Sequence, residues 1–194
     1  MPFAGSRAPD SSAGSSTRTG LFIDDQECHV SVSISSDLLT ERLILRSWSA
    51  GAAAAVLDGR RHAMWAADFP AEGDRVIAGL FAAHPDWLGP FGHRLIVERS
   101  SGLVVGSLGL FWPPADGELE LGYGIVASRR GRGYATEATV ALTAHAFTAP
   151  GVRVVHAAVE LANPPSVRVL EKAGFERVSS EDGLARFRAV AAPR

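Results

Sequence analysis

The alternation of apolar and polar residues predicts strands at the start of the patterned part of the chain. Valine and isoleucine alternate with serine over residues 30–34, which is typical of a short strand. Leu39, Leu43 and Leu45 follow in a segment that we interpret as the first strand of the core.

Downstream, the pattern predicts early helices, a hairpin, and then strands that alternate with helices. Residues 52–67 and 74–83 favour helix, with breaks at Asp58-Gly59 and Phe69-Pro70. The later expected elements are a hairpin of residues 93–98 and 104–111, a strand at 118–126, a helix at 134–147, a strand at 152–161, a helix at 164–173 with Gly174 at its C′ position, and a terminal hairpin over 175–190. This order predicts a mixed α/β fold, in which helices flank one sheet.

Composition narrows the class of protein. The chain has 194 residues, of which 46% are hydrophobic, so it can bury a sizeable core. Residues 1–26 are rich in Ser, Gly and Pro, and we expect a disordered tail there, followed by a single domain over 27–194. No apolar run approaches the roughly 18 residues that span a bilayer, and the first twenty residues lack the apolar stretch of a secretory signal. We therefore expect a cytoplasmic protein that binds no membrane.

Charge and the rarer residue types exclude several chemistries. A formal net charge of −2 argues against a nucleic-acid binder, which usually carries a basic stripe. Cys28 is the only cysteine, and the histidines lack metal-ligand spacing, so we expect neither an intramolecular disulfide nor a metal site. Lys172 is the only lysine and does not follow a glycine, which excludes the lysine of a P-loop NTPase.

Residues 118–138 carry the clearest binding signal, because a strand there leads through an Arg/Gly-rich turn into a helix. Gly131 and Gly133 allow the backbone to approach a ligand, and the first helical turn offers unpaired N–H groups. The arginines at positions 129, 130 and 132 add charge that suits a pyrophosphate. A tight strand-to-helix connection is the alternative interpretation. A dinucleotide fingerprint is disfavoured, since Thr136 stands where its third glycine would be.

Three motifs in order resemble the GNAT superfamily of acyl-CoA-dependent N-acyltransferases. Arg130-x-x-Gly133-x-Ala135 is similar to its pyrophosphate loop, and Asn163-x-x-Ser166 with the Leu-Glu-Lys-Ala-Gly-Phe run at 170–175 is similar to its late helix and turn. The segment at 39–46 looks like the opening strand of the branch that includes the ribosomal-protein N-acetyltransferases. The resemblance covers about residues 38–190.

The resemblance implies a splayed, mostly antiparallel sheet, with the strands at 118–126 and 152–161 diverging at their ends. Acetyl-CoA would donate the acetyl group, and its pantetheine arm would lie in the gap, where strand backbone lacks partners. The residues expected to bind it are Ile125, Val126, Ala127, Arg130, Gly131, Arg132, Gly133, Tyr134, Ala135, Thr136 and Asn163. Asn163 is also a favoured helix N-cap before proline, and the two roles are compatible.

Direct acetyl transfer to an amine requires a proton acceptor and a proton for the leaving thiolate. Glu120 is our candidate base, because it lies just upstream of the expected thioester-binding backbone; a solvated strand charge is the alternative. Glu118, one pleat further away, is expected to attract the substrate. Many superfamily members use a late-helix tyrosine to protonate the thiolate, and Val169 stands at the comparable position. The resembled branch suggests Ser166 as the proton donor instead; a hydroxyl that only satisfies the first helical turn is the alternative.

The acceptor side is less defined by sequence. Trp65, Trp112 and Tyr123 are candidates for its wall, with buried packing as the alternative for the tryptophans. The acceptor is expected to be an amine on a small molecule or at a protein N-terminus, and a homodimer is left open. An acyl-CoA-binding sensor or inactive homologue, and a partner-binding domain that has lost the cofactor, are the alternatives to an enzyme.

Overall fold

The computed structural model describes residues 37–192, so the expected tail, the strand at 30–34 and Cys28 lie outside the described residues. The helices are α1 (Ala50–Leu57), α2 (Glu72–Leu80), α3 (Tyr134–Ala146) and α4 (Pro164–Lys172), with short 3₁₀ turns η1 (Pro85–Leu88) and η2 (Ala127–Arg129). The strands are β1 (Leu38–Leu39), β2 (Leu43–Ser47), β3 (His93–Glu98), β4 (Val104–Leu110), β5 (Glu118–Ile125), β6 (Val154–Glu160), β7 (Glu176–Glu181) and β8 (Leu184–Val190).

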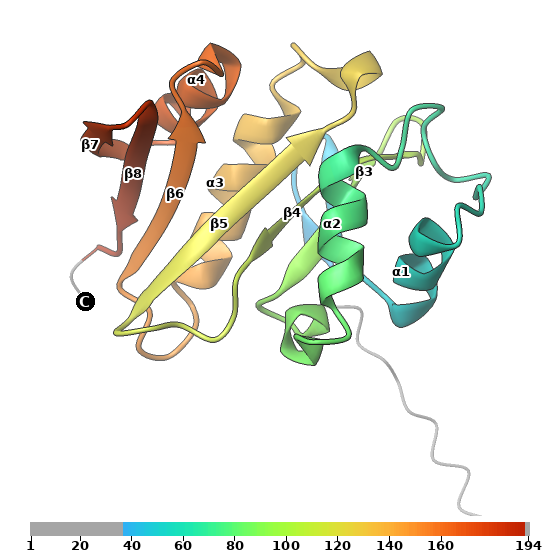
Figure 1. The fold of residues 1–194 in the computed structure, drawn as a ribbon, viewed down its shortest axis with the longest axis horizontal. Coiled ribbons are helices and arrows are strands. Elements are labelled where there is room, and N and C mark those ends of the chain that lie inside the picture. Colours follow the sequence, from blue (N-terminus) through green and yellow to red (C-terminus); the bar gives the residue numbers. More distant parts are fainter. Residues whose placement is uncertain (1–36, 193–194) are drawn as a thin grey trace, which may run out of the picture. The chain divides into compact units, whose positions relative to one another are not determined.

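The described strands form one sheet in the order β1-β2-β3-β4-β5-β6-β8-β7 (Figure 1). Neighbouring strands are antiparallel except β5 and β6, which are parallel. The prediction of a mixed α/β fold with a mostly antiparallel sheet is confirmed.

Strand β5 changes its neighbour along its length, and this change opens the sheet. At its start, residues 118–120 pair in parallel with residues 154–156 of β6. Further along, residues 121–125 pair with β4 instead. Beyond Glu120 the two strands β5 and β6 diverge, as the resemblance implied. Among residues 37–192, no strand pairs with the edge of β5 that faces β6 there, which leaves main-chain groups available to a ligand.

Helix α3 covers one face of the sheet and lies behind β5 in Figure 1. Its residues Ala138, Leu142 and Ala146 are buried and recur every fourth position, so they form one apolar stripe. Leu119 and Leu121 of β5 are buried against this side of the sheet. The apolar face of β5 therefore belongs to the core, and the opposite face is free to contribute to a binding site.

Helix α2 lies on the opposite face, in front of β4 in Figure 1. Asp74 of α2 hydrogen-bonds to Ser107 of β4, and Ser107 is registered opposite Gly124 of β5. The face of β5 that carries Glu118, Glu120 and two glycines thus continues under α2.

Two early elements differ from their predictions. The predicted break at Asp58-Gly59 is present, since α1 ends at Leu57 and Gly59 has a φ of +67°, but the helix expected to continue over residues 60–67 is wrong. Beyond the turn, Arg61 donates hydrogen bonds to the carbonyls of Ala66, Ala67 and Phe69, which stabilises an irregular loop. The first core strand is split into β1 and β2, since the Thr40 hydroxyl accepts a bond from the Leu43 N–H and fixes a turn.

The later elements match the prediction within a few residues. Gly174 ends α4 with φ +84°, and the N–H of Phe175 bonds to the carbonyl of Leu170 at 3.0 Å, as in a Schellman motif. No helix in residues 37–192 has the length and apolar content needed to cross a membrane.

Candidate active site

The turn between η2 and α3 presents main-chain N–H groups that have no acceptor. Gly131 and Gly133 have φ of +76° and +78°, in the left-handed region that glycine adopts readily. Gly133 is the N-cap of α3 and lacks a capping side chain. Within the described residues, none of the main-chain N–H groups of residues 131–136 donates a hydrogen bond. Such a row of free donors at the positive end of a 13-residue helix suits an anion.

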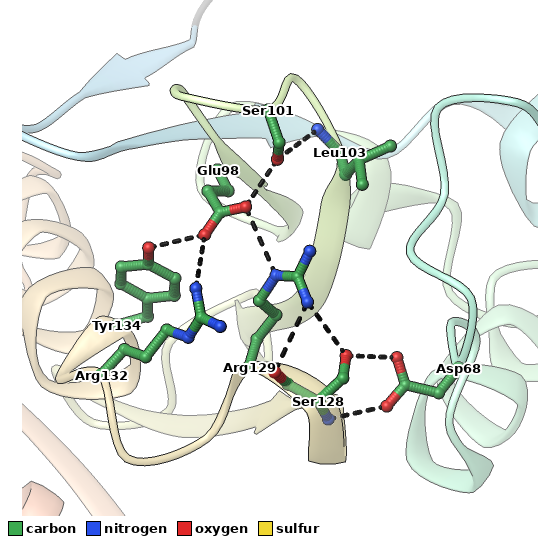
Figure 2. A network of polar contacts seen from close by, with 8 residues as sticks. All are labelled: Asp68, Glu98, Ser101, Leu103, Ser128, Arg129, Arg132 and Tyr134. Carbon is green, nitrogen blue, oxygen red and sulfur yellow. Dashed lines mark hydrogen bonds and ion pairs between the residues drawn. The ribbon is translucent and has the colours of Figure 1, made fainter.

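Glu98, at the end of β3, holds this turn in place and is drawn above it in Figure 2. Its side chain accepts hydrogen bonds from the hydroxyls of Ser101 (2.5 Å) and Tyr134 (2.6 Å), and from Arg129 (3.3 Å) and Arg132 (3.4 Å). Glu98 is only 4% exposed, and the bonds from Ser101 and Tyr134 lower the pKa of its carboxyl. The same contact raises the pKa of Tyr134. One buried carboxylate thus holds two of the three arginines of the turn.

The third arginine of the turn is differently engaged. The Nε of Arg130 donates to the carbonyl of Ile125 at 3.0 Å, and its terminal nitrogens form no hydrogen bond among residues 37–192. Arg168 and Lys172 of α4 line the same space and make no ion pair with any described residue. These three cations are available to an anionic ligand.

A second carboxylate anchors the start of α3 to the turn between β1 and β2. Glu137 accepts hydrogen bonds from the Thr40 hydroxyl (2.6 Å), from the Arg42 N–H (2.8 Å) and from the Arg42 guanidinium (2.7 Å). Burial alone would raise the pKa of Glu137, but these bonds outweigh it and lower the pKa. Arg42 also donates to the carbonyl of Arg132 at 2.8 Å. Glu137 therefore connects α3 to the turn between β1 and β2, in addition to the favourable interaction with the helix dipole that its sequence position indicates.

A third anchor comes from the irregular loop after α1. Asp68 accepts bonds from the N–H (2.8 Å) and the hydroxyl (2.7 Å) of Ser128 in η2 (Figure 2). The main-chain bond from Ser128 contributes most to the lowered pKa of Asp68. The backbone between β5 and α3 is thus held from three sides.

The first cleft, of about 430 Å³, lies between this turn, the free edge of β5 and α4. It brings together most of the residues that the sequence assigned to acetyl-CoA. Its lining residues are Tyr123, Gly124, Ile125, Arg129, Arg130, Gly131, Arg132, Gly133, Tyr134, Ala135, Thr136, Asn163, Pro165, Ser166, Arg168, Val169 and Lys172. Val126 and Ala127 do not line it, and the N–H of Val126 is used by the carbonyl of Val105.

Tyr123 connects the two sides of the sheet opening. Its hydroxyl donates to the carbonyl of Ser166 at 2.9 Å, and burial raises its pKa to about 12. Asn163 caps α4, since its side chain accepts a bond from the Ser166 N–H at 3.3 Å. The Ser166 hydroxyl lines the cleft and makes no hydrogen bond with a described residue. It is thus available to a ligand.

A second cleft, of about 330 Å³, lies between α2 and the β4–β5 face. Its walls are formed by Ala71, Glu72, Gly73, Asp74, Ile77, His93, Ser107, Leu108, Phe111, Gly122, Tyr123, Gly124, Ile125 and Arg130. The two clefts share Tyr123, Gly124, Ile125 and Arg130. A ligand in one cleft therefore lies next to a ligand in the other, on either side of this short stretch of β5.

The other residues singled out from the sequence lie outside both clefts. Glu118 and Glu120 are exposed, on the same face of β5 as the cleft residue Gly122. Trp65 is buried and its ring meets that of Phe69 edge to face, with centroids 5.2 Å apart. Trp112 stacks on Phe91, with centroids 5.1 Å apart. Both tryptophans pack as the alternative interpretation expected.

Sequence reasoning missed Glu98 and Asp74. Glu98 ends an apolar strand, and a charge at that position is ordinary at a strand terminus. Asp74 stands three residues after the N-cap of α2, where an acidic residue favours any helix start. Only their burial distinguishes them, and sequence offers no signal of it. Among the described residues, no three His, Cys, Asp or Glu side chains gather as metal ligands.

Comparison with known families gives one broad match. A family model described as an acetyltransferase (GNAT) domain matches residues 42–176. The uncharacterized N-acetyltransferase p20 of Bacillus licheniformis is 29% identical over 83 residues, which are 42% of this chain and 47% of that protein. The match thus spans about half the length of this curated relative.

Solved structures share the fold over most of the chain. A protein of Bordetella pertussis assigned to the GNAT-family acetyltransferases is 28% identical, with a TM-score of 0.56, and the match covers 78% of this chain and 96% of that one. A Vibrio cholerae protein described as a ribosomal-protein-serine acetyltransferase is 19% identical, with a TM-score of 0.58, covering 80% and 97%. At that identity the likeness concerns the fold alone.

Proposed function

Because this chain belongs to the GNAT acetyltransferase family, we propose that it transfers the acetyl group of acetyl-CoA directly to a primary amine in a ternary complex. The observation that carries the proposal is the meeting of two clefts at residues 123–125. One cleft is cationic and lined by free N–H groups, and the other has a mostly apolar wall. Donor and acceptor would meet at that stretch of β5.

The first cleft suits coenzyme A. The free main-chain N–H groups of residues 131–136 would bind the pyrophosphate. The positively charged side chains of Arg130, Arg168 and Lys172 would pair with the phosphates of coenzyme A. The unpaired edge of β5 near Ile125 would hold the amide-rich pantetheine arm, with Asn163 and Ser166 on the opposite wall. Acetyl-CoA, when bound, supplies a thioester whose acetyl carbon accepts a nucleophile.

Gly124 supports the passage of the acetyl group from one cleft to the other. A Cβ atom at this position would have no neighbouring atom within 4 Å, so the space beside Gly124 is open. The amine nitrogen would form a bond to the acetyl carbon while the carbon–sulfur bond breaks and leaves a thiolate. The thiolate then takes a proton, and Ser166 is the donor that we propose.

Glu120 would receive the proton that the attacking nitrogen loses. It lies on the face of β5 that leads to Gly122 and Gly124, outside the cleft lining, so we propose transfer through a water molecule. Glu118, further along the same face, would attract the ammonium form of the acceptor.

Two measurements test the proposal. Calorimetric titration of acetyl-CoA should give binding, and the release of free CoA should depend on added amine. Binding without amine-dependent release would favour a sensor, and the absence of binding would favour a partner-binding domain without cofactor.

The carboxylate roles are separated by kinetic constants. Glu120→Gln should lower kcat by roughly 10²–10⁴-fold, with acetyl-CoA affinity unchanged. Glu118→Gln should raise the acceptor KM while kcat holds, as when uniform binding is lost. A Glu120→Gln enzyme with wild-type kcat at saturating amine would refute the base assignment.

A further inference from the structure

The second cleft is mostly apolar but contains one buried carboxylate. Ile77 and Phe111 are among the nonpolar residues that line it. Asp74 lines the same space and is 4% exposed. A buried carboxylate needs hydrogen-bond donors or a cation, because removing its charge from water is costly.

Asp74 has only part of that requirement met. One oxygen accepts the N–H of Ala71 at 2.8 Å, and the other accepts the hydroxyl of Ser107. A carboxylate offers about four acceptor positions, so two remain for a ligand. Burial raises the pKa of Asp74, which indicates that the described contacts do not fully compensate its charge. An ammonium group would supply the missing donors.

His93 adds an independent sign of a ligand in this cleft. It is 2% exposed, lines the cleft, and its Nε2 has no hydrogen-bond partner among the described residues. Its ring lies among Phe81, Trp87 and Phe111, with centroids 5.1–5.8 Å away. Burial lowers its pKa to about 4, so it is neutral near pH 7. A buried polar atom without a partner is rare, and a ligand is one way to satisfy it.

The number of charges limits the acceptor. A polyamine or an aminoglycoside carries several ammonium groups, each of which needs an anionic or polar partner. The cleft offers Asp74 and the exposed Glu72, and Arg130 in the same wall opposes further positive charge. Its volume of about 330 Å³ is roughly twice that of a cavity that holds benzene, so it has room for about a dozen non-hydrogen atoms.

We propose that the acceptor is a small primary monoamine with an aromatic or branched nonpolar body, held by its ammonium group on Asp74. The nonpolar body would pack on Ile77 and Phe111, with His93 facing it. This inference rests on the proposed acetyl transfer and names its acceptor class. Asp74 would thus set acceptor affinity, and the nitrogen that it holds would pass a proton through water to Glu120 before it attacks the acetyl carbon.

An acceptor panel tests the class in the wild-type enzyme. With acetyl-CoA saturating, CoA release is measured for 2-phenylethylamine, spermidine, kanamycin and a short peptide with a free N-terminus. We expect kcat/KM for 2-phenylethylamine to exceed each of the others by at least tenfold. A higher value for spermidine, kanamycin or the peptide overturns this inference and leaves acetyl transfer intact. No release with any amine, despite acetyl-CoA binding, overturns both.

Variants test the residue. Asp74→Asn should raise the KM for 2-phenylethylamine at least tenfold, with kcat within threefold and acetyl-CoA affinity unchanged. The same change at the exposed Asp86, outside both clefts, should leave KM within twofold. Ile77→Ser keeps the carboxylate of Asp74 and should reduce the ratio of kcat/KM for 2-phenylethylamine to kcat/KM for spermidine. This variant tests the apolar wall even if Asp74→Asn does not fold. An unchanged KM in folded Asp74→Asn, or an unchanged preference in Ile77→Ser, refutes the assignment.

Discussion

Replacing Glu98 with glutamine probes the support of the phosphate-binding turn with little change in volume. The carboxylate accepts four hydrogen bonds, with one hydroxyl and one arginine on each oxygen. Glutamine keeps one accepting oxygen and turns the other into a donor. In either orientation one arginine then faces an NH₂ group, which cannot accept its hydrogen bond.

The expected cost follows from those contacts. A hydrogen bond to a charged group contributes about 1.5–3 kcal/mol, and breaking a buried ion pair costs about 3–5 kcal/mol. Arg129 and Arg132 are partly exposed, with 23% and 49% of their side-chain areas accessible, so the lower range applies. We expect Glu98→Gln to lose about 1.5–3 kcal/mol of unfolding free energy at pH 7.

Urea unfolding measures this loss. Glu176→Gln is the control, since Glu176 is exposed and its side chain makes no hydrogen bond with a described residue; it should remain within about 0.5 kcal/mol of wild type. Because the folded pKa of Glu98 is lowered, its contribution is complete above the unfolded pKa and is lost as pH falls through the folded pKa. The gap between wild type and Glu98→Gln should therefore narrow below about pH 4. An equal midpoint for both proteins at pH 7 would refute the role of Glu98.

Further predictions concern the turn and acid stability. Gly133→Asp, which adds an anion beside the free amides, should weaken CoA binding at least 100-fold by calorimetry. Gly183→Asp places an aspartate at the same φ of +78° in the β7–β8 turn, outside both clefts, and should keep CoA affinity; equal CoA binding by both variants would contradict the phosphate site. Glu137 and Asp68 also have lowered pKa values, so stability should fall as pH decreases from about 5 to 3, measured by thermal melts in a pH series. The melting temperature of Glu137→Gln should depend less on pH than that of the wild type. An unchanged pH dependence would show that the bonds between Glu137 and Arg42 do not stabilise the fold.

The sequence predicted the elements whose pattern is local. The helix at 134–147 and the strand at 93–98 were found within one residue, because the four-residue apolar spacing of the helix and the continuous apolar run at 95–97 of the strand are visible directly in the chain. The break at Asp58-Gly59 was predicted, but the helix after it, over 60–67, was wrong: alanines favour helix there, and the bonds that Arg61 donates stabilise a loop instead.

The candidate site divides in the same way. The Arg/Gly turn could be predicted because its residues are contiguous, and glycine spacing reports backbone conformation. Asp74 and Glu98 could not, because each acts through side chains far away in sequence, Ser107 and Tyr134 respectively. Burial of a carboxylate arises from tertiary packing, which no local pattern records.

The change of neighbour along β5 has a mechanical consequence. Within the described residues, β6, β8 and β7 join the rest of the sheet through only three residue pairs, at 118–120 of β5. Contacts between α3 and α4 brace the same junction from behind. A pantetheine chain in the opening would span both halves and take the position of an absent strand. Amide hydrogens in β6 should then exchange more slowly with acetyl-CoA than without it, and the stiffness of the molecule would rise and fall with every catalytic cycle.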